Sequence, residues 1–288
     1  GRFVAIAGYE WTSQPKYWTD LANGALSERL FPGPPRFFSH KIVYFPARLD
    51  YLFSAKDTAC NTPDLLAAAV QKHGGLIHNA HPEAGPEGKD QFDYARSNST
   101  VIANTEMLPD AMRYQGTNYV LHGEETLRAF LNKDGRTGFV GGSDTHEGKP
   151  AARTAILARE LTREAIFEAL GRRRNYAITH ARIGLDFRIN GHVMGEEIEV
   201  DGAPQIVVEV KGTDRIKEVV IIRDGEVLRS VQPMTKDLDF EHADRAFTGP
   251  SYYYVRIVQM DKDAHGNFSQ AWSSPIWVKK PPPRRGVR

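Results

Sequence analysis

Cysteine is almost absent from this sequence of 288 residues, and its scarcity excludes two kinds of stabilising site. Cys60 is the single cysteine, so the chain has no intrachain disulfide framework and no cysteine-based zinc cluster. Secreted proteins can also lack disulfides. The cysteine count therefore leaves both the redox compartment and the localisation open.

The sequence also lacks a long hydrophobic run and an excess of charge of either sign. No apolar run approaches the ~20 residues that a membrane-spanning helix needs, so no span is expected. Lys and Arg together number 37 and Asp and Glu number 36, which gives a formal net charge of +1. This balance gives no indication of binding to nucleic acid or to an anionic membrane surface.

Short apolar runs alternate with helical patterns over residues 1–182. Five runs are predicted to be strands: 3–7, 41–45, 75–80, 101–108 and 138–142. A helix is predicted to begin at Pro63 after the capping residue Thr62, and two more are predicted over 124–132 and 163–174. Strands that alternate with helices predict an α/β domain with a parallel sheet or barrel.

Residues 183–280 have a different pattern. Period-two and β-rich stretches replace the helical periodicity, and Asp224-Gly225 lies between two of them, which is a strong signal for a hairpin turn. This part is predicted to be a separate antiparallel β-sandwich. The tail, residues 281–288, is rich in Pro and Arg and is expected to be mobile.

Side chains that commonly bind metals lie at or beside four of the predicted strands. They are Glu10, His40, His81, Asp144 and His146. In α/β barrels the carboxyl ends of the strands carry the chemistry, so we expect these side chains to meet at one rim. Carboxylates and imidazoles without thiolates are suited to zinc, manganese or iron.

Each of these residues also has a structural interpretation. Asp144 could cap a helix, His81 could lie in the turn before Pro82, and Glu10 could be a surface acid. His40 differs from the others because it begins its run instead of ending it.

Two further residues of this region, Arg153 and His78, could contribute to the site. Arg153 follows the loop of Asp144, and its planar guanidinium could bind a substrate phosphate; an ordinary surface arginine is the alternative. His78 lies in the run that leads to His81 and is interpreted as a core residue or as a support for that ligand.

Five motifs resemble those of the PHP (polymerase and histidinol phosphatase) superfamily. They are GYEWT at 8–12, HKIVYF at 40–45, NAHPE at 79–83, GGSDTH at 141–146 and LTREAIFEALGRRRNYAITHARI at 161–183. The sequence also resembles an uncharacterised bacterial branch with a C-terminal β-domain that ends like AWSSPIWV at 271–278.

The resemblance implies a fold, an activity and a set of ligands. PHP proteins have a distorted (β/α)7, TIM-like barrel that holds up to three metals, and their characterised members are mostly phosphoesterases. By this resemblance Glu10 would bridge two metals, His40 and His81 would each bind one, and Asp144 and His146 would complete the cluster.

One family motif has no counterpart here. PHP barrels open with a His-x-His pair, followed by an Asp and a further His, whereas no histidine precedes His40 in this chain. A barrel without its first strands would expose unpaired edges. Because the chain also begins with Gly1 instead of Met, we expect the natural protein to supply the missing part and a complete site with two or three divalent cations.

The sequence thus predicts a metal-dependent hydrolase. The main hypothesis is a phosphoesterase in which a metal-bridging hydroxide attacks a small-molecule phosphate ester. Hydrolysis of another bond, such as an amide, is the alternative reaction. A catalytically degenerate barrel joined to a β-sandwich binding module is the non-enzymatic alternative, and analogy of fold cannot separate these hypotheses. The sequence gives no indication of the oligomeric state.

Overall fold

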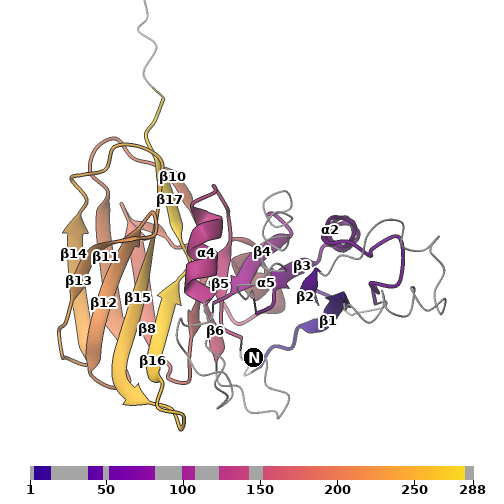
Figure 1. Cartoon of the computed structure of the whole chain (residues 1–288), viewed down its shortest axis with the longest axis horizontal. Coiled ribbons are helices and arrows are strands. Elements are labelled where there is room, and N and C mark those ends of the chain that lie inside the picture. Colours follow the sequence, from indigo (N-terminus) through magenta and orange to yellow (C-terminus); the bar gives the residue numbers. More distant parts are fainter. Residues whose placement is uncertain are drawn as a thin grey trace, which may run out of the picture.

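The computed structural model describes residues 3–13, 38–47, 52–81, 99–107, 123–142 and 152–282. Of these residues, 45% lie in strands and 13% in three short helices. A five-stranded sheet lies at one end of the molecule, and two further sheets pack face to face at the other end (Figure 1). The described part of the chain is therefore mostly β.

The five-stranded sheet contains the predicted strands of the first part of the chain. Its strands are β1 (Ala7–Ser13), β2 (Ser39–Phe45), β3 (Leu76–Asn79), β4 (Ile102–Glu106) and β5 (Gly138–Val140), in that spatial order. β1 and β2 pair antiparallel, as do β2 and β3, whereas β3, β4 and β5 are parallel to one another. The sheet is therefore mixed, with β1 at one edge.

The prediction of a distorted (β/α)7, TIM-like barrel for residues 1–182 is wrong. Such a barrel needs parallel strands joined by helical crossovers, and two of the four pairings in this sheet are antiparallel. Four of the five predicted runs coincide with observed strands, and the run 3–7 overlaps β1 only at Ala7. Their alternation with helices could not show which neighbours would run antiparallel, because the spacing between runs does not fix strand direction.

The three helices in the described residues are α2 (Pro63–Lys72), α4 (Gly123–Leu131) and α5 (Arg163–Gly171). The predicted start of α2 is confirmed: the Thr62 side chain accepts a hydrogen bond from the backbone N–H of Leu65, and Pro63 occupies the first turn. None of these described helices is long and apolar enough to cross a membrane.

The two remaining sheets form a sandwich. Its strands are β6 (Arg153–Ile156), β7 (Asn175–Ile178), β8 (Gly184–Ile189), β9 (His192–Val193), β10 (Glu197–Glu199), β11 (Gln205–Lys211), β12 (Ile216–Arg223), β13 (Glu226–Val231), β14 (Asp237–Ala243), β15 (Ser251–Lys262), β16 (Phe268–Ser273) and β17 (Ile276–Lys279). One sheet has the order β14-β11-β8-β9, and the other contains the remaining strands. Fully buried Phe187 and Val208 of the first sheet pack with Ile221 and Tyr253 of the second.

Hydrogen bonding within the sandwich crosses the predicted domain boundary at 182/183. β7 pairs antiparallel with β16, so a strand from the first part of the chain extends a sheet of the second. The predicted hairpin is confirmed: Arg223 pairs with Glu226, and the turn residues Asp224 and Gly225 have φ of 52° and 85°. A glycine tolerates this backbone conformation without strain.

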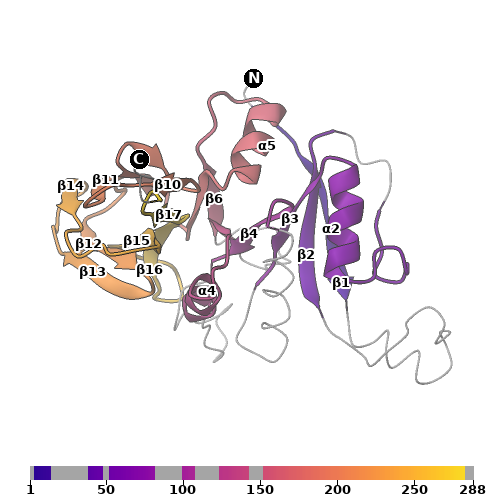
Figure 2. The ribbon, with the colours of Figure 1, turned by 90° about the horizontal axis from the view of Figure 1, so that it is seen from above.

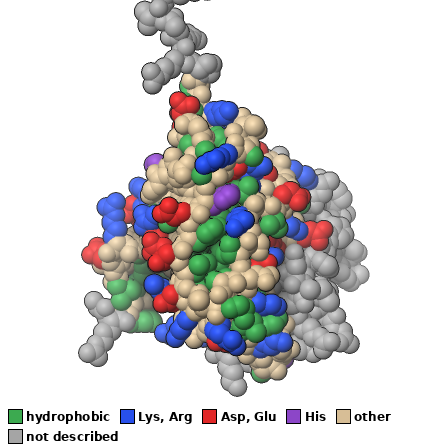
Figure 3. All heavy atoms as spheres, turned by 90° about the vertical axis from the view of Figure 1, so that its left-hand side faces the viewer, with side chains coloured by type: hydrophobic (Ala, Val, Ile, Leu, Met, Phe, Trp, Pro, Cys, Tyr) green, Lys and Arg blue, Asp and Glu red, His purple; other side chains and the backbone are tan. Residues whose placement is uncertain are grey.

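The outer face of the sandwich carries side chains of both charges. Figure 3 shows Lys and Arg interspersed with Asp and Glu around a narrow apolar strip. On the described part of this face, neither sign gathers into a large patch. This distribution agrees with the near-zero net charge of the sequence.

Glu124 joins the first part of the chain to the sandwich. Its buried carboxylate, 2% exposed, accepts hydrogen bonds from the Tyr254 hydroxyl at 2.7 Å, from Arg256 Nη1 at 3.1 Å and from Trp272 Nε1 at 3.1 Å. These donors come from β15 and β16, and α4 lies between the sandwich and the strands β1 and β2 (Figure 2). Hydrogen bonds to a charged acceptor are stronger than neutral ones.

Replacing Glu124 tests this junction. Glu124→Gln should lower the free energy of unfolding by about 2–4 kcal/mol, because a neutral amide leaves buried donors without a charged acceptor. Urea denaturation measures the change, with Glu209→Gln on the exposed face of β11 as a control that leaves stability within about 0.5 kcal/mol of the parent. Equal stability of the two variants would show that the junction contributes nothing.

Lys41 is a buried cation in the middle of the sheet. It is 0% exposed, and its ammonium donates to the carbonyl oxygens of Phe38 at 2.7 Å and His40 at 3.5 Å. Desolvation by burial lowers the pKa of Lys41 to about 7. Folding at neutral or lower pH therefore places a positive charge in an apolar environment.

Lys41→Met should stabilise the protein, by about 1–4 kcal/mol at pH 6 in the presence of a chelator. The sign follows from proton linkage: between pH 7 and 10.5 the unfolded chain keeps the lysine proton that the folded chain releases, so parental stability rises with pH. The advantage of the variant should shrink over that range. Denaturant titrations at pH 6, 8 and 10 measure it, and a constant difference would contradict the assignment.

Candidate metal centre

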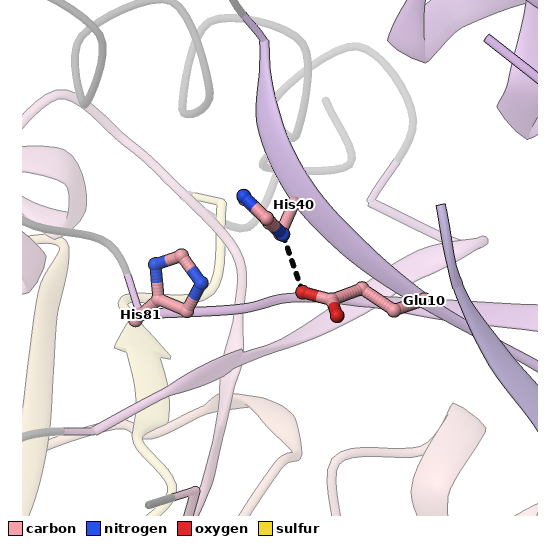
Figure 4. Close-up of side chains that lie close together, drawn as sticks. All are labelled: Glu10, His40 and His81. Carbon is pink, nitrogen blue, oxygen red and sulfur yellow. Dashed lines mark hydrogen bonds and ion pairs between the residues drawn. The ribbon is translucent and has the colours of Figure 1, made fainter. Parts of the chain in front are cut away.

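Three of the predicted ligands come together in the structure. One ligand atom from each of Glu10, His40 and His81 lies within 4.8 Å of the other two. Glu10 comes from β1, His40 from β2, and His81 follows β3; the three side chains gather at one place (Figure 4). That these side chains bind a metal stays a prediction.

Strand pairing explains how residues so far apart in the sequence meet. Glu10 lies opposite Ile42 and Thr12 lies opposite His40, so Glu10 and His40 project from the same face of the β1–β2 pair. The expected strand 3–7 is displaced to Ala7–Ser13. Glu10 is therefore in the middle of a strand and not after its end.

The β2–β3 pairing brings in the third ligand. The backbone N–H of Ala80 donates to the carbonyl oxygen of His40 at 3.2 Å, and His81 is the next residue. The imidazole rings of His40 and His81 have their centroids 4.8 Å apart, with the ring planes tilted by 56°. In this arrangement the rings of His40 and His81 can each direct one nitrogen toward the same cation.

Glu10 and His40 form a close pair. Glu10 Oε1 lies 2.5 Å from His40 Nδ1, and the Thr12 hydroxyl lies 3.3 Å from the same nitrogen. The Glu10 side chain is 37% exposed and the His40 side chain 22%, so a cation can reach the pair from solvent. This is a hydrogen-bonded contact between a carboxylate and an imidazole.

A cation could use this pair in two ways. Two ligands at ~2.0–2.1 Å from one tetrahedral ion lie about 3.3 Å apart, so direct binding by both atoms requires the pair to open and lose its proton. Alternatively, Glu10 keeps its hydrogen bond to Nδ1 and orients Nε2 of His40 toward the cation. Only the second arrangement keeps the Glu10 and His40 side chains as they lie.

The backbone of His81 is held by a residue that the sequence analysis missed. Glu106, the last residue of β4, accepts a hydrogen bond from the His81 N–H at 2.6 Å and is 8% exposed. Burial would raise the pKa of the Glu106 carboxyl, but the His78 imidazole and the His81 N–H bring it below its usual value. Glu106 thus remains an anion. A carboxylate inside the apolar run 101–108 was the signal that could have identified it.

The predicted ligands Asp144 and His146 lie outside the described residues. The described chain reaches Gly142, and a β-carbon at that position would lie 1.9 Å from Glu106 Oε1. The backbone therefore passes directly against the Glu106 carboxylate two residues before Asp144. Only glycine permits so close an approach.

Arg153 begins β6 beside the end of β5. Its Nη1 donates to the carbonyl oxygen of His180 at 2.7 Å, and its backbone packs against Gly141. A guanidinium has five N–H donors, so this contact does not use up its capacity. The role of Arg153 in binding a substrate stays a prediction.

The donor set fits a catalytic divalent cation. Two imidazoles and one carboxylate form a three-ligand set that leaves a coordination position for water or substrate, as in catalytic zinc sites. The same set also binds manganese or iron. A structural zinc site is a poorer match, because those sites use four ligands that are mainly thiolates and imidazoles.

Comparisons with known proteins give relatives without an assigned function. No protein-family model matches the chain. Uncharacterised proteins of Chlamydia pneumoniae, Chlamydia trachomatis and Chlamydia muridarum are similar to it, with 28%, 26% and 26% identity over 96% of the chain. The chain spans about half of the length of these relatives, 47% in each case.

One solved structure is similar to part of the chain. Fibronectin(III)-like modules of Clostridium thermocellum CbhA match 33% of this chain and 94% of that one, with 14% identity and a TM-score of 0.21. A TM-score this low supports no conclusion about the fold.

Cation binding should stabilise the folded protein. Zn²⁺ or Mn²⁺ at about 100 times its dissociation constant should raise the free energy of unfolding by about 2.7 kcal/mol, and a chelator should reverse the gain. His40→Ala and His81→Ala should each remove most of this gain, because each deletes a ligand. Thermal denaturation with and without the cation measures it.

His265→Ala is the matched control, because His265 lies exposed in a turn of the sandwich. It should keep the full stabilisation by the cation. An equal loss in all three histidine variants would place the binding elsewhere.

Proposed function

We propose that the protein is a metal-dependent hydrolase and that its substrate is a phosphate ester. The observation that carries the proposal is the convergence of Glu10 from β1, His40 from β2 and His81 after β3, with their ligand atoms within 4.8 Å of one another. The resemblance of the motifs around these residues to PHP proteins adds support. The barrel of that superfamily is not part of the proposal.

Some of these side chains would bind the cation, and Arg153 would bind the substrate. A bound divalent cation would polarise a phosphoryl oxygen and lower the pKa of water toward neutrality. Glu10, His40 and His81 would hold it, together with Asp144 and His146. Arg153 would orient the phosphate through N–H groups other than the one that contacts His180.

Hydrolysis of an amide is a second candidate. Two histidines and one glutamate are also the ligand set of zinc peptidases, so the composition of the described centre does not favour a phosphate over an amide. The charge of the substrate separates the candidates. An anionic phosphate ester uses the Arg153 guanidinium, whereas a neutral amide has less need of a cationic side chain.

Phosphoesterase activity tests the proposal. The full-length protein, loaded with Mn²⁺ or Zn²⁺, should hydrolyse p-nitrophenyl phosphate or its bis-ester, and Asp144→Ala should lower kcat at least 100-fold. Arg153→Ala should raise KM more than it lowers kcat, because its guanidinium binds ground state and transition state alike.

Arg188→Ala on the sandwich is the control and should leave both constants unchanged. Elemental analysis of the same preparation should find more than one transition metal per chain. Full activity of Asp144→Ala would remove that residue from the mechanism. A metal-free protein without activity on either ester would favour the non-enzymatic alternative, a degenerate scaffold with a β-sandwich binding module.

A further inference from the structure

We propose that Glu106 is a positioning residue, which holds the backbone of His81 so that its imidazole stays against Glu10 and His40. The inference rests on the proposed metal centre. Glu106 itself would not bind the cation. It would act through the backbone of one predicted ligand, His81.

Glu106 contacts the backbone of His81 directly. The carboxylate Oε2 accepts the His81 N–H at 2.6 Å, a short, charge-assisted hydrogen bond. His81 has a φ of 26°, which is unfavourable for a residue with a β-carbon. A strained backbone persists where the surroundings determine it, and this hydrogen bond does so at the residue whose imidazole faces His40.

The Glu106 carboxylate is itself held in place by neighbouring side chains. Glu106 Oε1 lies 3.5 Å from Nε2 of His78, and Nδ1 of His78 hydrogen-bonds with the Tyr44 hydroxyl. His78 and Glu106 are both buried, at 7% and 8% exposure. Contacts from β2 and β3 therefore hold the carboxylate of β4 in one orientation. Of the two interpretations of His78, the structure shows a buried residue, and a supporting role for His78 stays a prediction.

Glu106 also lies against the backbone of Gly142. The backbone of Gly142 passes so close to Glu106 that a β-carbon there would lie 1.9 Å from Oε1 and 2.6 Å from Oε2. Gly142 precedes Asp144 by two residues. One buried carboxylate thus lies against the backbone of both His81 and Gly142.

A buried glutamate with a purely structural role would share one property with a positioning residue, the loss of stability when it is replaced. A buried glutamate that only stabilises the edge of the sheet would lower stability when replaced but would leave the geometry of the ligands intact. The test therefore needs a readout of ligand geometry. Co²⁺ provides it, because its visible absorption depends on the number and arrangement of its ligands.

The experiment is a Co²⁺ titration of the full-length protein by visible absorption, with parallel denaturation curves. Glu106→Ala should weaken Co²⁺ binding by about 10–100-fold and change the visible spectrum, as losses of outer-sphere partners do. Glu106→Gln should restore much of the affinity, because its amide oxygen can still accept the His81 N–H. Glu124→Gln is the matched control: another buried glutamate, replaced away from the centre, should cost stability but leave Co²⁺ affinity and spectrum unchanged.

A second variant, Gly142→Ala, perturbs the Glu106 carboxylate without replacing Glu106. Gly142→Ala should displace Glu106 and reproduce the weaker binding and altered spectrum, so the test does not depend on the folding of Glu106→Ala. Parental Co²⁺ affinity and spectrum in the folded Glu106 variants and in Gly142→Ala would overturn the positioning role alone. Absence of Co²⁺ binding by the parent would instead overturn the metal centre itself, and this inference with it.

Discussion

The register of β1 against β2 is the constraint on which the candidate metal centre depends. Thr12 lies opposite His40, and this pairing sets Glu10 and His40 on one face while Trp11 and Lys41 share the other. A slip of one residue would exchange the two faces. Trp11 is 1% exposed and packs in the apolar core, so such a slip would expose a large side chain. The core on one face therefore fixes the ligands on the other.

The parallel half of the sheet is tied to the sandwich by buried polar contacts. The Phe139 N–H donates to the Ser274 hydroxyl at 2.8 Å, and the Asn175 side-chain amide donates to the Phe139 carbonyl oxygen at 2.7 Å. These contacts fix β5, and hence the start of the GGSDTH motif, relative to the sandwich. Buried hydrogen bonds thus join the sandwich to the sheet that carries the candidate site.

Local structure was more predictable from the sequence than topology. The cap of α2 and the Asp224-Gly225 turn follow from side chains within a few residues, and both are observed. The barrel was wrong because strand direction depends on contacts across the sheet. The convergence of Glu10, His40 and His81 was expected, although for a reason that does not hold: they meet through antiparallel register and not at the rim of a barrel. Glu106 was missed because its partners, His78 and the His81 N–H, become neighbours only when the sheet forms.

Anomalous X-ray scattering from crystals grown with Zn²⁺ or Mn²⁺ tests the central claim most directly. Data on either side of the absorption edge of the metal locate the ion without assumptions about its ligands. The account predicts an anomalous peak at about 2.0–2.2 Å from ligand atoms of His81 and of the Glu10–His40 pair. A metal bound at another surface, with these three side chains free of it at full metal loading, would contradict the account.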